Sequence, residues 1–140
     1  MSECDKEPCK SLIDAYWAKA IDAHDAALTA RVHCDLWKAG LRFFWVLFAI
    51  WLAVFAQAAA CAAMRLPEWV CAGLTVASLA LLGALATGGV RILLLGRLAQ
   101  RAREECRLRH SEMLSAHRAI SVNCPRECRP EIVTVECGCS

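Results

Sequence analysis

Two long apolar stretches, separated by only four residues, restrict this chain more than any other feature. The first (43–64) contains one polar side chain, Gln57, and the second (69–90) contains no charged residue. About twenty residues of α-helix cross the ~30 Å hydrocarbon layer of a bilayer, and each stretch has 22. A soluble chain of 140 residues is too small to cover two such helices. We therefore expect two transmembrane helices.

The connection between the stretches, Arg-Leu-Pro-Glu (65–68), is polar and contains a proline. Proline does not continue a helix comfortably, and the two charged side chains need water or lipid headgroups. We therefore expect a tight turn between antiparallel spans. Both ends of the chain then lie on one side of the membrane.

The segments that flank the spans have the pattern of long helices. Ser11 and Asp14 are typical of a helix N-terminus, and apolar or small residues then recur at alternating spacings of four and three. The first arm carries Tyr16, Ala20, Ala23, Ala27, Ala30, Cys34, Trp37 and Leu41, and the second carries Leu95, Ala99, Ala102, Cys106, Arg109, Met113, Ala116 and Ile120. We expect the arms to pack together, with Cys34 and Cys106 as neighbours.

These patterns predict an all-α membrane protein, a two-span helical hairpin with long arms and a short Cys-rich tail. In chain order we expect a polar N-terminal segment (1–10), an amphipathic arm (11–42), the first span (43–64), the turn (65–68), the second span (69–90), an Arg-rich arm (91–121) and the tail (122–140).

Small residues at intervals of four predict where the two spans touch. Such stripes allow helix backbones to approach closely in lipid. The expected packing residues are Gly73, Ala77, Ala80, Ala84 and Gly88 in the second span, and Ala56 and Ala60 in the first. Gln57 is expected to hydrogen-bond to Thr75 or Ser78 across the interface, and a role in a pore is the alternative.

Basic residues predict the orientation. Nine Lys or Arg residues flank the spans on the terminal side and only Arg65 lies at the turn, so both termini should face the positive-inside compartment. Mitochondrial inner, bacterial inner and viral membranes are all compatible. We expect Arg91, Arg97 and Arg101 to contact anionic lipid headgroups. Acidic residues lie among these arginines and aromatic residues do not, which argues against nucleic acid as a partner.

The cysteines near the two ends are the strongest remaining signal. We expect structural roles for Cys4, Cys9, Cys124, Cys128, Cys137 and Cys139. Three alternatives remain for these cysteines: disulfides, a four-thiolate metal site and free thiols. The cysteine spacings lack the knuckles typical of a zinc site. An inside location opposes disulfides unless the setting is oxidising, as in a virion. We favour two nested disulfides, Cys124–Cys139 and Cys128–Cys137.

No haem, phosphate-loop or zinc-protease motif is present, so we expect neither an enzyme nor a small-molecule substrate. Bound lipids are expected and no other cofactor, with zinc the less favoured alternative. The layout resembles the two-span effector domains of bacterial nucleotide-signalling defence systems, which keeps a homo-oligomeric pore among the alternatives. The favoured hypothesis is an accessory or scaffold subunit of a larger membrane assembly. A metal or redox protein that uses the tail thiols is the third.

Overall fold

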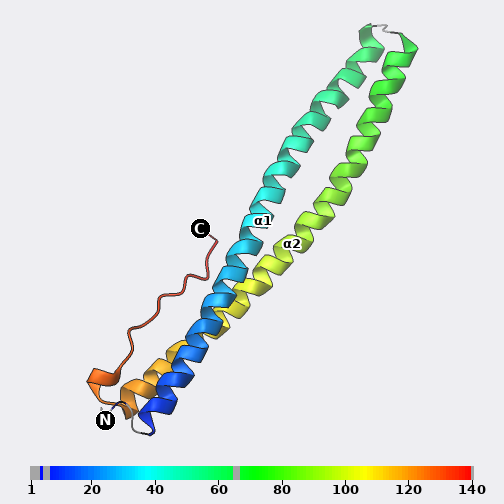
Figure 1. Cartoon of the computed structure of the whole chain (residues 1–140). Coiled ribbons are helices and arrows are strands. Elements are labelled where there is room, and N and C mark those ends of the chain that lie inside the picture. Colours follow the sequence, from blue (N-terminus) through cyan, green and yellow to red (C-terminus); the bar gives the residue numbers. More distant parts are fainter. Residues whose placement is uncertain (1–3, 5–6, 65–66, 140) are drawn as a thin grey trace. The chain divides into compact units, whose positions relative to one another are not determined.

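A computed structural model describes residue 4 and residues 7–64 and 67–139 of the chain. It contains two α-helices of 56 residues each, α1 (Cys9–Met64) and α2 (Glu68–Asn123), a 3-10 turn η2 (Arg126–Cys128) and an extended tail (Figure 1). The prediction of an all-helical chain built on two long apolar helices is confirmed.

The prolines explain why each arm continues into its span without a break. All four prolines lie outside α1 and α2, and Pro8 and Pro67 immediately precede the two helices. α1 begins two residues before the predicted start, and the Ser11 hydroxyl donates to the Pro8 carbonyl (2.9 Å) instead of capping the helix. Residues 65 and 66 of the predicted turn lie outside the described residues.

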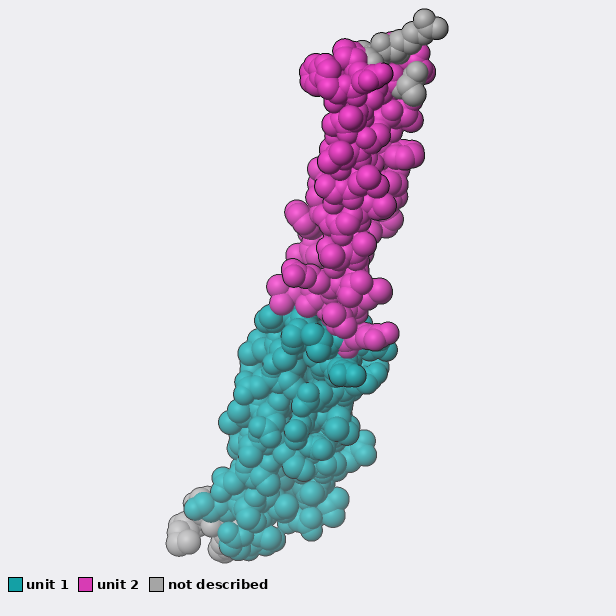
Figure 2. All heavy atoms as spheres, turned by 90° about the vertical axis from the view of Figure 1, so that its right-hand side faces the viewer, with its two compact units in different colours: residues 1–35, 98–140 teal, residues 36–97 magenta. Residues whose placement is uncertain are grey.

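The chain divides into two compact units (Figure 2). Unit 1 comprises Met1–Asp35 and Leu98–Ser140, and unit 2 comprises Leu36–Arg97. Within each unit a part of α1 lies antiparallel to a part of α2. Unit 1 also contains the tail.

Unit 1 has a narrow core between its two helix segments. Its fully or almost fully buried residues are Tyr16, Ala20, Ala23, Ala30 and Cys34 in α1 and Ala99, Cys106, Met113 and Ile120 in α2. These nine residues all belong to the predicted alternation of four and three, and Cys9 (6% exposed), at the start of α1, is buried outside it. Alanine on both helices allows their backbones to approach. Leu41, at the end of the predicted repeat, lies in unit 2 and is exposed.

The apolar surface of unit 2 is almost uncovered by protein. The most apolar windows of the two helices have mean hydropathies of 2.1 and 2.0, and 0% and 11% of their residues are buried. Both helices are long and apolar enough to cross a membrane, by length and composition. The core helix of a soluble protein would be mostly buried, so the exposure of these windows argues against that reading.

The small-residue stripe predicted to be a packing face lies mostly outside the contact between the two helices of unit 2. Gly73, Ala77, Ala80 and Ala84 are exposed, as is Ala56, whereas Gly88 and Ala60 are partly buried. The most buried α2 residues of this unit are Ser78 and Leu85. The interface therefore lies on a neighbouring face of α2.

Aromatic residues of α1 give a physical reason for this shift. Phe44, Phe48 and Trp51 are partly buried and stack along α1, and an added Cβ at Gly89 would lie 3.8 Å from the Phe44 ring. Bulky rings hold the helices too far apart for alanine to meet alanine. Gln57 was predicted to hydrogen-bond to Thr75 or Ser78, but it is exposed and forms neither bond among the described residues; the Thr75 hydroxyl donates to the Ala72 carbonyl (2.8 Å).

Candidate functional site

The most distinctive assembly in the chain is a set of four disulfides in unit 1, which we call the terminal lock. It consists of Cys4–Cys128, Cys9–Cys124, Cys34–Cys139 and Cys106–Cys137. The Cα–Cα distances are 5.4, 5.6, 5.7 and 5.7 Å, within the range that a disulfide spans. Each bond joins the tail to a helix or to the N-terminal segment.

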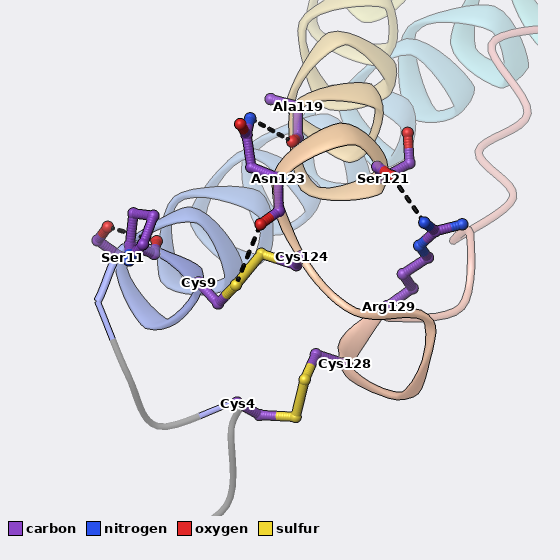
Figure 3. The surroundings of a disulfide bond; sticks show 10 residues. Cys4, Cys9, Ser11, Ala119, Ser121, Asn123, Cys124, Cys128 and Arg129 are labelled. Atoms are coloured by element: carbon purple, nitrogen blue, oxygen red, sulfur yellow. Dashed lines mark hydrogen bonds between the residues drawn. A yellow bond between two sulfur atoms is a disulfide. The ribbon is translucent and has the colours of Figure 1, made fainter.

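The first half of the lock joins Cys4 and the first residue of α1 to the start of the tail (Figure 3). Cys9 is the first residue of α1 and Cys124 directly follows α2, so their bond ties the two helix ends together. Cys128, at the end of η2, reaches Cys4. The Arg129 guanidinium donates to the Ser121 carbonyl (2.7 Å), which holds the chain close to α2 as the tail begins.

Extended backbone explains how the second half of the lock reaches both helices. Successive side chains of an extended segment point to opposite sides, so residues two apart share one side. Along the tail the partly buried residues are Val133, Val135, Cys137 and Cys139, whereas the residues between them are exposed. Cys137 bonds to α2 and Cys139 bonds to α1. Three consecutive residues therefore connect the two helices covalently.

Tyr16 of α1 holds the backbone in the middle of the tail. Its side chain is fully buried, its hydroxyl donates to the Glu131 carbonyl (2.9 Å), and the same oxygen accepts from the Val133 amide (3.2 Å). The Nε2–H of His117 donates to the Pro130 carbonyl (3.2 Å). These bonds to backbone groups need no particular side chain in the tail, which explains why so few apolar residues suffice there.

The predicted participation of six terminal cysteines in structural bonds agrees with the structure, but the predicted pairing is wrong. Cys124 and Cys128 bond to the N-terminal segment and to α1, and Cys137 and Cys139 bond to the helices, so the nested tail hairpin does not form. The physical reason is that the extended tail presents Cys137 and Cys139 on one side, toward the helices. A nested hairpin would instead have to turn the tail back on itself.

Four cysteines were missed as structural residues. Cys34 and Cys106 bond to the tail, although the sequence pattern had placed them in one interface. Cys61 and Cys71 form a fifth disulfide in unit 2, with Cα atoms 5.7 Å apart. Their signal was symmetry, because Cys61 lies three residues before the end of α1 and Cys71 lies three residues after the start of α2.

The three arginines predicted to contact headgroups, Arg91, Arg97 and Arg101, are all exposed. Arg31 pairs with Glu136 (4.0 Å) and Arg109 pairs with Glu112 (3.7 Å), and neither ion pair involves these arginines. Both pairs are exposed and contribute little to stability.

Each of the two units contains a cavity. A polar cleft of about 280 Å³ lies in unit 1 between Asp25 and Glu105, and an apolar groove of about 560 Å³ lies in unit 2. No group of three or more His, Cys, Asp or Glu side chains that could hold a metal ion occurs in the described residues. No family model, curated protein or solved structure matches the chain.

Proposed function

We propose that the chain is a non-catalytic accessory or scaffold subunit of a larger membrane-embedded assembly. Unit 2 anchors it as a two-span hairpin, and unit 1 docks partner subunits outside the bilayer. The observation that carries this proposal is an exposed apolar row on α1 in unit 1. Its members are Trp17, Ile21, Leu28 and Val32, with exposed fractions of 47, 61, 48 and 57%.

The row has the geometry of a helix-docking face. Spacings of four, seven and four place its members on one side of α1. Four large apolar side chains in a line, outside the apolar spans, are costly to leave in water and are typical of an interaction surface. The terminal lock supports this role, because a rigid surface loses less conformational entropy when a partner binds.

Purification of the native complex in mild detergent tests the proposal. We expect a heteromeric complex, and we expect Ile21→Asn together with Leu28→Asn to reduce the amount of co-purified partner at least about tenfold, because central apolar contacts dominate interface energetics. Leu108→Asn is the matched control, since Leu108 is 59% exposed on the other helix. If the control removes the partner equally, the row is not the docking surface.

A pure homo-oligomer in the same experiment would favour the second candidate, a pore. Gln57 is exposed on unit 2 and is not buried between its two helices, which favours this alternative. In a ring of hairpins this side chain would be available to line a polar path.

We further propose that both termini lie on the positive-inside face, because nine flanking basic residues outweigh one at the turn. Mitochondrial inner, bacterial inner and viral membranes remain the candidates. A glycosylation acceptor placed at Glu68 should be modified when the turn faces a glycosylating lumen, whereas acceptors at either terminus should not. Modification at a terminus and not at Glu68 would reverse the orientation.

A further inference from the structure

The apolar groove of unit 2 lies where the apolar stretches give way to basic residues. Its lining includes Phe44 and Leu47 from α1, Ile92 and Leu95 from α2, and the small residues Ala84 and Gly88. An added Cβ at Gly88 would meet no atom within 4 Å, so the groove is open at this residue. At Gly40, which also lines it, an added Cβ would lie 3.5 Å from Ile92, so the helices touch there.

Arg91 places a positive charge on the lining of this groove, and no acidic residue that the structure describes lines it. Arg91 directly follows the second apolar stretch. The acidic residue of unit 2 is Glu68, at the turn, and Arg91 forms no ion pair with a described residue.

We propose that this groove binds one anionic phospholipid, with an acyl chain along the apolar walls and the phosphate at Arg91. The proposal rests on membrane insertion of unit 2. A phospholipid has its negative charge at the junction of polar and apolar regions, which is where the groove has its positive charge. An apolar helix would also fit the lining of the groove, but it would leave the positive charge of Arg91 without a negative partner.

Lipid titration of the purified full-length protein in mild detergent tests the site. Dioleoyl phosphatidylglycerol and dioleoyl phosphatidylcholine are added separately, and retained lipids are counted by native mass spectrometry. We expect one tightly retained phosphatidylglycerol per chain. Each basic side chain contributes about 1 kcal/mol at an anionic surface, so Arg91→Gln should lower its affinity about fivefold and leave phosphatidylcholine almost unchanged.

Filling the groove should remove both lipids. Gly88→Leu places a side chain in open space within the groove, and we expect retention to fall more than about tenfold. Gly83→Leu is its matched control, because an added Cβ at Gly83 also meets nothing within 4 Å and Gly83 does not line the groove. Arg107→Gln, in unit 1, is the control for charge. Equal retention by Gly88→Leu and Gly83→Leu would overturn the proposal.

Two further outcomes are informative. A dimer that Gly88→Leu dissociates would overturn the lipid proposal in favour of a second copy in the groove. Carbonate extraction of membranes separates this inference from the proposed function: wild-type protein in the soluble fraction would refute the membrane anchor itself. Protein that stays in the membrane fraction but shows no preference for phosphatidylglycerol would refute the lipid site alone.

Discussion

Reduction of the purified protein should release residues 124–139 from the two helices and expose them to proteases. The tail buries little apolar surface, since Val133 and Val135 are only partly covered and Ile132 is 54% exposed. Ordering each residue costs roughly 1–2 kcal/mol, which contacts of this size do not offset. Each cross-link typically contributes about 2–4 kcal/mol, so opening the terminal lock should raise cleavage by Glu-specific protease at Glu131 and Glu136 at least about tenfold.

The variant that isolates this effect removes one bond of the lock. Cys106→Ser with Cys137→Ser frees the tail from α2, and cleavage at Glu136 should increase. Cys61→Ser with Cys71→Ser is the matched control, because it removes a disulfide that spans 10 residues in unit 2 and should leave tail cleavage unchanged. Alkylation of the denatured wild-type protein before reduction should modify no cysteine. Ten alkylated cysteines at that stage would refute the lock.

The observed disulfide pairing shows which part of the structure could be predicted from the sequence. Helix content and the interface of unit 1 follow from periodicity and from the positions of the prolines, which are local properties. Pairing of Cys137 with Cys106 and of Cys139 with Cys34 depends on where an extended tail lies on two helices. The alternation from Val133 to Cys139 indicates which side of the tail faces the helices but not where along them the tail lies, because Tyr16 and His117 hold its backbone and not its side chains.

The position of the small-residue stripe has a different explanation. Alanine and glycine at intervals of four permit close helix approach, but they do not require it. Large side chains such as Phe44, Trp51 and Leu85 decide the contact, because burying them removes more surface than burying alanine. The exposed stripe, with Gly73 and Ala80, is left available for another helix or for lipid.

The five disulfides also bear on the proposed orientation. In a two-span hairpin, Cys61–Cys71 lies near the turn side and the terminal lock lies on the opposite, terminal side. Cytosol keeps thiols reduced, whereas secretory, periplasmic and virion surfaces are oxidising. With the termini on the positive-inside face, formation of the lock requires an oxidant on that face. A compartment or particle that supplies one is therefore part of the proposal.

Truncation of Leu85 should destabilise the hairpin of unit 2 more than truncation of any exposed leucine nearby. Leu85 is 6% exposed and is the most buried leucine of α2, so Leu85→Ala leaves a cavity between the helices. Leu→Ala changes of this kind typically cost about 2–5 kcal/mol. Unfolding of the protein in detergent micelles by increasing sodium dodecyl sulfate, followed by tryptophan fluorescence, measures the change.

Leu82→Ala is the matched control for this substitution. It removes the same atoms from the same helix, but Leu82 is 47% exposed. In lipid or detergent its side chain exchanges one apolar surrounding for another, so its truncation should cost well under about 1.5 kcal/mol. Ala84→Leu should likewise be tolerated, since Ala84 lies on the exposed stripe. If Ala84→Leu instead destabilises the protein as much as Leu85→Ala, the stripe packs against another chain. That result would identify the second helix surface through which the anchor joins its assembly.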